Sequence, residues 1–126
     1  MTFRLLGDEN TSHRLVSACR GLISDFPIVH IADWQDGMWL GLDDTALLTG
    51  GAEADLVLVA FDRSTLGWHA GQLIRAGQDH AGITLFRGTV RSSDYGYQAR
   101  LLTGFWQNEG ALWDWRNRMV YLPRSL

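Results

Sequence analysis

The chain has 126 residues, an apolar fraction of 46% and a net charge of −3. This length predicts a single domain, residues 1–126, that can bury a core, and this composition excludes a disordered chain. The longest apolar run, Leu56–Phe61, is far too short to cross a bilayer, and the first residues lack the pattern of a signal peptide. We therefore expect no membrane partner. The single cysteine, Cys19, cannot form an internal disulfide, so we expect a cytoplasmic protein.

Charge is distributed unevenly along the chain, and every basic residue is an arginine. Residues 1–62 contain ten acids and three arginines, a balance of −7, whereas residues 63–126 contain four acids and eight arginines, a balance of +4. The asymmetry is either compositional drift or a sign of an acidic pocket beside arginines that hold a polyanion. The overall acidity argues against strong, non-specific binding to duplex nucleic acid.

The first part of the chain predicts two strands with a helix between them. Residues 3–6 form a short apolar run, and residues 28–31 are apolar and β-branched, as is typical of strands. Apolar side chains recur at three- and four-residue spacing over residues 15–23, which indicates one buried helical face. This helix should end near Ser24, because Pro27 disfavours helical geometry just before it. Its candidate N-terminal caps are Asn10, Thr11 and Ser12.

A short helix and the clearest strand of the chain come next. Asp43 or Asp44 begins the helix, and Gly50-Gly51 ends it. Leu56–Phe61 is apolar on both faces, as expected for a parallel strand that helices cover on each side. A further helix is predicted over residues 65–76. Its inward-facing residues are expected to be Leu66, Ala70, Leu73 and Ile74.

The remaining residues continue the alternation of strand and helix. Residues 82–86 predict a fourth strand, and Ser92 or Ser93 caps a helix with one apolar stripe. An amphipathic stretch over residues 112–118 leads into the apolar run Met119–Leu122. This alternation predicts an α/β fold, a three-layer α/β/α sandwich around a mainly parallel sheet of four to five strands, with the first four in the order 2-1-3-4.

Two acids follow directly after two of the predicted strands. Asp8 comes just past the first strand and Asp62 just past the third. Neighbouring strands lie about 4.8 Å apart, and sites in such sheets form at the carboxyl ends of the strands. Asp43 or Asp44 could approach the same point from the start of a helix. Converging carboxylates bind hard cations, so we expect Mg²⁺ or Mn²⁺ and metal-assisted attack on a phosphodiester.

Several of these residues also have a purely structural interpretation. Asp8 could cap the turn that follows it, and Asp43 or Asp44 could cap a helix. The histidines have no metal-ligand spacing and are expected to be structural or on the surface. Gly50-Gly51 lacks the Lys-Ser/Thr of a phosphate-binding P-loop. The late tryptophans are expected in the core or at an interface.

Five segments, in order, resemble one known family. FRLLGDENTSHRLVSACR resembles the opening of the small, single-domain PIN-like proteins of bacteria, which begin with a strand and Leu-x-Asp-Glu-Asn and continue into a helix. LDDTALL resembles their second-helix segment, LVLVAFDRSTL their third strand, HAGITLFRG their fourth strand and WRNRMVYLP their C-terminal ending. The resemblance covers nearly the whole chain. It implies a PIN-like sandwich related to Mg²⁺/Mn²⁺-dependent ribonucleases, many of which are thought to be toxins of toxin–antitoxin pairs.

Carried over residue by residue, the resemblance implies that Asp8, Asp44 and Asp62 are the catalytic metal ligands, with Asp43 as the alternative to Asp44. Glu9 and Asn10 lie next to Asp8 and are expected to support the site.

The chain departs from the family pattern after the third strand. Relatives usually have Thr-x-Asp-x-Asp-Phe there, whereas this chain continues from Asp62 with Arg63 and Ser64, so that the second acid is a serine. We therefore expect weaker metal binding, a single ion or lost catalysis. Ser64 could still hold a metal-bound water, and Arg63 could steady the phosphate.

Three functions follow from these residues. The leading hypothesis is a metal-dependent ribonuclease with RNA as substrate and an antitoxin protein as partner. The alternative is a catalytically inactive PIN-like module that binds a protein, and either form leaves a homodimer open. The third is a phosphoreceiver-like signalling domain, which the lack of lysine disfavours, because that class uses a lysine to sense the phosphoryl group.

Overall fold

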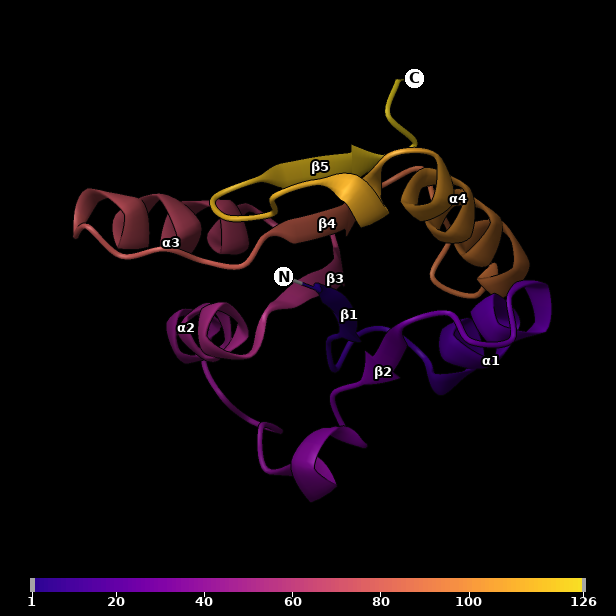
Figure 1. Cartoon of the computed structure of the whole chain (residues 1–126), viewed down its shortest axis with the longest axis horizontal. Coiled ribbons are helices and arrows are strands. Elements are labelled where there is room, and N and C mark those ends of the chain that lie inside the picture. The colour runs from indigo at the N-terminus through magenta and orange to yellow at the C-terminus, as the bar shows by residue number, and fades with distance from the viewer. Residues whose placement is uncertain (1, 126) are drawn as a thin grey trace.

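The computed structural model describes residues 2–125, apart from the side chain of Ser64. Five strands in these residues form one parallel sheet. The strands are β1 (Arg4–Gly7), β2 (Ile28–His30), β3 (Leu56–Phe61), β4 (Ile83–Phe86) and β5 (Met119–Leu122). They lie in the order β2-β1-β3-β4-β5 (Figure 1). The predicted order of the first four strands is confirmed, and β5 continues the sheet beyond β4.

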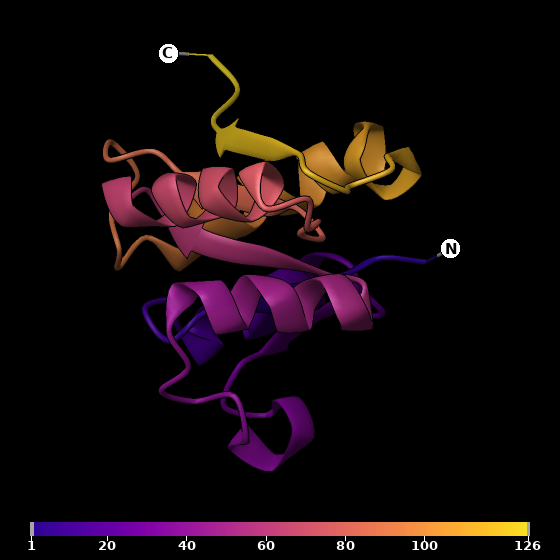
Figure 2. The ribbon, with the colours of Figure 1, turned by 90° about the vertical axis from the view of Figure 1, so that its left-hand side faces the viewer.

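Helices cover both faces of the sheet. The helices are α1 (His13–Leu22), α2 (Asp44–Ala54), α3 (Ser64–Arg75) and α4 (Tyr95–Asn108), with two short 3-10 helices, η1 (Trp34–Gly37) and η2 (Gly110–Leu112). Helices α1 and α4 pack on one face, and α2 and α3 on the other (Figures 1 and 2). The predicted three-layer sandwich is therefore confirmed. Within residues 2–125, no helix is long and apolar enough to cross a membrane.

The alternation of side chains along each strand divides the core into two halves. Leu5 of β1 and Val57 of β3 pack with α1 and α4, whereas Leu6 and Leu58 pack with α2 and α3. Successive residues of a strand point to opposite faces, so a strand covered on both sides must be apolar throughout. This requirement explains the unbroken apolar run of β3.

Helix α2 does not end at Gly50-Gly51, so that prediction is wrong. It continues to Ala54, and Asp55 ends it in the left-handed conformation, with φ +54°. The two glycines allow close packing instead. A Cβ at Gly50 would lie 2.9 Å from the Trp39 ring, and a Cβ at Gly51 would lie 2.9 Å from the carbonyl oxygen of Leu56. In this helix the glycines provide room for neighbours rather than a stop.

Two further expectations about the helices need correction. Asp94 caps α4 by accepting a hydrogen bond from the Tyr97 N–H, so the cap is neither Ser92 nor Ser93. Ile74 is half exposed rather than inward-facing. The amphipathic stretch 112–118 runs from the last residue of η2 through turns to β5. In it, the fully buried Trp115 donates its indole N–H to the Gly110 carbonyl, 2.8 Å away, so the late tryptophans are partly in the core, as predicted.

Cys19 is a buried, unreactive thiol. Cys19 lies on the buried face of α1 and is fully buried. Burial raises the pKa of its thiol to about 12, and the nearby charge of Arg20 lowers this pKa by a smaller amount. Because the thiolate is the reactive form, this cysteine acts as a small apolar side chain, as the sequence predicts.

Buried His80 gives the fold a pH dependence. Its ring is 1% exposed, and its Nδ1 accepts a hydrogen bond from the Gly82 N–H, 3.1 Å away. Burial lowers the pKa of His80, and the charge of Asp79 only partly opposes this. Protonation would remove the acceptor on Nδ1, so the folded state holds the neutral ring.

We therefore expect the free energy of unfolding to fall as the pH drops below about 6.5, the ordinary histidine value. In that range the unfolded chain binds the proton more readily than the folded chain, so acid favours unfolding, and the contribution is fully present above it. Urea titrations between about pH 5 and 7 measure this slope. His80→Asn, which keeps an acceptor, should flatten it, whereas the control His69→Asn should not. Equal slopes in all three proteins would contradict this role of His80.

Candidate functional site

The carboxyl end of β1 turns sharply around Asp8. The Asp8 carboxylate, 3% exposed, accepts hydrogen bonds from the backbone N–H groups of Asn10 and Thr11 through Oδ1, at 3.0 and 3.1 Å. The Thr11 hydroxyl donates in turn to the Asp8 carbonyl, 2.7 Å away. Gly7 is required before this turn, because a Cβ there would lie 2.6 Å from the Thr11 hydroxyl. Asp8 therefore does cap its own turn, and its second oxygen remains for another partner.

That partner is Arg63, which connects two of the predicted metal ligands. One guanidinium nitrogen donates to Asp8 Oδ2 at 2.8 Å, and the other donates to Asp44 Oδ1 at 2.7 Å. Burial lowers the pKa of Arg63, but its hydrogen bonds and charge attraction to the two acids outweigh this effect and raise the pKa above its ordinary value. The guanidinium is therefore a permanent cation held between two carboxylates.

Asp43 and Asp44 have different partners at the start of α2. Asp43 is the N-terminal cap, and its Oδ1 accepts a hydrogen bond from the Ala46 N–H, 2.8 Å away. Asp44 is the first residue of the helix and reaches Arg63. Of the two roles expected for this pair, Asp43 has the structural one, because it caps α2. Asp44 faces the candidate site.

Glu9 and Asn10 complete a pocket of about 230 Å³ over this end of the sheet. The Glu9 carboxylate accepts a hydrogen bond from the Gly41 N–H, which connects the β1 turn to the loop before α2. The pocket is lined by Asp8, Glu9, Asn10, Ile31, Gly41, Leu42, Asp44, Leu47 and Arg63. Four of the residues predicted to form or support the site therefore share it with Arg63.

Asp62 lies apart from this pocket. It follows β3, its backbone N–H donates to the Phe86 carbonyl, and its side chain is exposed. It is not among the residues that line the pocket around Asp8 and Asp44. Ser64 begins α3, and its side chain is outside the described part of the structure. The structure thus brings Asp8 and Asp44 together, but it does not add Asp62 to them.

This arrangement does not fit a divalent cation. Both facing oxygens, Asp8 Oδ2 and Asp44 Oδ1, are hydrogen-bonded to the Arg63 guanidinium, whose single positive charge offsets one of the two negative charges. Magnesium needs oxygens at about 2.0–2.1 Å in an octahedral shell, so an ion could enter only if Arg63 left. Within residues 2–125, no group of three His, Cys, Asp or Glu side chains is placed to hold a metal. In this structure the two acids face an arginine, to which both are bonded.

The role of Arg63 as this internal cation is the feature that the sequence did not reveal. The sequence predicts Arg63 near the site, as a partner for phosphate. Its position directly after Asp62 gave no sign that its side chain would reach back to β1 and α2. Only the packing of α2 beside α3 shows that Asp44 and Arg63 can meet.

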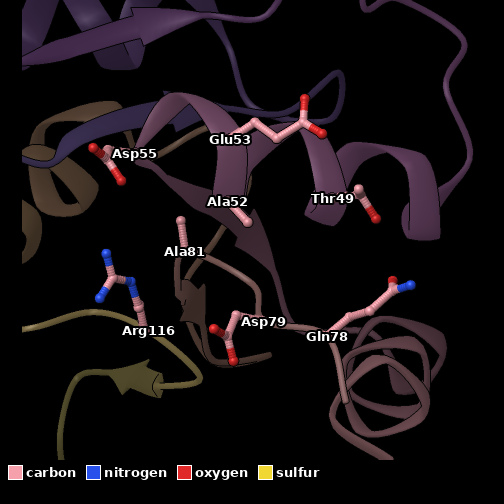
Figure 3. Close-up of a pocket in the computed structure, with 8 residues that line it drawn as sticks. All are labelled: Thr49, Ala52, Glu53, Asp55, Gln78, Asp79, Ala81 and Arg116. Carbon is pink, nitrogen blue, oxygen red and sulfur yellow. The ribbon is translucent and has the colours of Figure 1, made fainter. Parts of the chain in front are cut away.

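A larger pocket, of about 430 Å³, lies at the opposite edge of the sheet (Figure 3). Its charged lining residues are Glu53, Asp55, Asp79 and Arg116, from the end of α2, the loop before β4 and the turn before β5. Asp79 Oδ1 accepts a hydrogen bond from the Asn117 amide, 2.8 Å away. Sites in parallel sheets form at the other edge, at the carboxyl ends of the strands, so the Arg63 pocket is the better candidate.

Comparison with known proteins does not add a relative. No protein-family model, curated protein or solved structure matches the chain.

Proposed function

We propose that this chain is a PIN-like module that binds a partner protein and does not cut RNA. The observation that supports it is the Arg63 bridge, which gives Asp8 and Asp44 a permanent cation from the chain itself. The serine at position 64, where the family has an acid, agrees with this proposal. An arginine can pair with a phosphate, but it cannot bind a water and lower its pKa to supply the attacking hydroxide as a metal ion does.

The second candidate is the Mg²⁺/Mn²⁺-dependent ribonuclease, with RNA as its substrate and an antitoxin as its partner. One observation favours it: Asp8, Glu9 and Asp44 line one pocket at the carboxyl edge of the sheet. In that function, Asp8, Asp44 and Asp62 would hold the ion, and Arg63 would have to leave the two acids.

Calorimetric titration with Mn²⁺ and an RNA cleavage assay separate the two functions. For the binding module we expect a flat titration, and we expect RNA incubated with Mg²⁺ or Mn²⁺ to be cut no faster by the wild-type chain than by Asp8→Asn. That variant keeps an oxygen acceptor for the turn but removes the charge that a metal needs. Stoichiometric Mn²⁺ binding together with cleavage that Asp8→Asn abolishes would overturn the binding-module proposal and establish the ribonuclease.

A further inference from the structure

The segment between β2 and α2 exposes three apolar side chains. Met38, Leu40 and Leu42 are 75%, 49% and 40% exposed. They alternate with half-buried Trp39, whose ring packs on α2, and with Gly41, whose backbone N–H bonds to Glu9. In Figures 1 and 2 the purple segment around η1 projects from the body of the sandwich, beyond β2 and α2. We call Met38, Leu40 and Leu42 the loop patch.

The loop patch is held in place from behind. The Trp39 ring packs so closely on Gly50 of α2 that a Cβ there would lie 2.9 Å away, and it meets the Trp34 ring edge-on at 5.9 Å. The Gly41 N–H donates to the Glu9 carboxylate. A preformed surface loses little conformational entropy when a partner binds, so this anchoring favours a docking role.

The backbone of the same segment adopts costly conformations. Gln35 and Asp36 have φ values of +46° and +58°, and Gly37 and Gly41 have φ values of +80°. A left-handed conformation costs about 1 kcal/mol or more for a residue other than glycine. Strain of this kind often accompanies function, because the surrounding structure must hold it in place.

Acids flank the loop patch along the chain. Residues 33–44 contain four acids and no basic residue. Asp33, Asp36 and Asp43 are exposed, whereas Asp44 is half-buried and paired with Arg63. Exposed Glu9 bonds to the backbone of Gly41, next to Leu40 and Leu42 of the patch. An apolar centre with an acidic rim complements a partner that has apolar side chains flanked by lysine or arginine. It disfavours a second copy of this chain, whose rim has the same charge.

We propose that the loop patch and its acidic rim dock a basic amphipathic segment of a partner protein. This inference rests on the proposed function and names the surface and the chemistry through which it acts. The apolar side chains supply the buried area, and the acids select the charge of the partner and speed its approach.

Two synthetic peptides test the inference. Each is an amphipathic helix of about four turns with the same leucine face, and the polar face carries lysine in one peptide and glutamate in the other. Fluorescence anisotropy measures their binding to the whole chain in EDTA. We expect the lysine peptide to bind at least about tenfold more tightly than the glutamate peptide. We expect this affinity to fall as salt rises from about 50 to about 300 mM.

Variants then locate the binding surface. Met38→Ser/Leu40→Ser should weaken the lysine peptide by about tenfold or more, because two exposed apolar side chains leave the contact. Asp33→Asn/Asp36→Asn should also weaken it. The matched control is Leu112→Ser, at the 89% exposed Leu112 of η2 on the far face of the sheet, which should bind as the wild type does.

Four outcomes would overturn the inference: no binding of the lysine peptide, equal binding of both peptides, unchanged binding by Met38→Ser/Leu40→Ser, or an equal loss in Leu112→Ser. Light scattering that shows a dimer of the wild type and a monomer of Met38→Ser/Leu40→Ser would also overturn the inference. The occupant of the loop patch would then be a second copy of this chain. Because EDTA removes metal, these results are independent of the Mn²⁺ and RNA assays. The Mn²⁺ and RNA assays can therefore contradict the proposed function while the peptide still binds the loop patch. Equally, the peptide can fail to bind while those assays support the proposed function.

Discussion

Replacing Arg63 with glutamine should lower the free energy of unfolding by about 2 kcal/mol and give the chain an affinity for Mn²⁺ that the wild type lacks. The loss follows from Asp8, whose buried carboxylate would keep its charge but lose its counter-charge. Removing one partner of a buried ion pair costs about 3–5 kcal/mol, and the partial exposure of Arg63 reduces this figure. The gain in metal affinity follows because Asp8 and Asp44 would then face each other without a cation.

Urea denaturation with and without Mn²⁺ measures both effects. A ligand that binds only the folded chain stabilises it, so Mn²⁺ should restore part of the stability lost in Arg63→Gln and leave the wild type unchanged. Adding Asp8→Asn to Arg63→Gln should recover stability, because the uncompensated charge disappears, and should remove the response to Mn²⁺. This double-mutant cycle separates the Asp8–Arg63 pair from general effects of either change.

The matched control is Arg75→Gln, in the last turn of α3, the helix that follows Arg63. Arg75 is exposed and makes one long hydrogen bond, 3.4 Å, to Gln72. Its replacement should shift stability by less than about 0.5 kcal/mol. If Arg63→Gln were no less stable than Arg75→Gln and did not bind Mn²⁺, the Arg63 bridge would have no importance for the site.

The fold was predictable from sequence because its strands are defined by local pattern. The continuous apolar run of β3 is typical of a strand covered on both faces, and β3 lies between β1 and β4 in the sheet. The errors occur where a residue acts through a distant neighbour. Glycine commonly ends a helix, but at Gly50 the missing side chain makes room for Trp39, which precedes α2 in the chain.

The candidate site shows the same limit. Strand order predicted that Asp8 would lie at the carboxyl edge of the sheet, and the start of α2 supplied Asp44. The direction of a side chain beyond a strand end is not fixed by alternation, so it could not be foreseen that Asp62 would be exposed and would not line the pocket. The reach of Arg63 depends on three elements at once, β1, α2 and α3, and no local pattern encodes it.

Gly82 is the position where the smallest substitution should do the most damage. It lies just before β4 with φ +109°, and its carbonyl accepts a hydrogen bond from the Leu58 N–H of β3. A Cβ there would lie 2.7 Å from the Trp115 ring and 2.8 Å from the Trp115 carbonyl oxygen. Trp115 is fully buried and its backbone cannot move aside cheaply. We therefore expect Gly82→Ala to lower the free energy of unfolding by about 3 kcal/mol, from strain and overlap together.

Two other glycines separate these causes. Gly77 has φ +75° with open space around it, so Gly77→Ala should cost only the strain, about 1 kcal/mol. Gly71 lies within α3 with nothing near its added methyl, so Gly71→Ala should stabilise the chain by about 0.5–1 kcal/mol. Urea denaturation followed by tryptophan fluorescence ranks the three variants. A Gly82→Ala chain as stable as Gly77→Ala would mean that β4 and the Trp115 turn can separate without loss, and that the close contact between them is not what holds this edge of the sheet together.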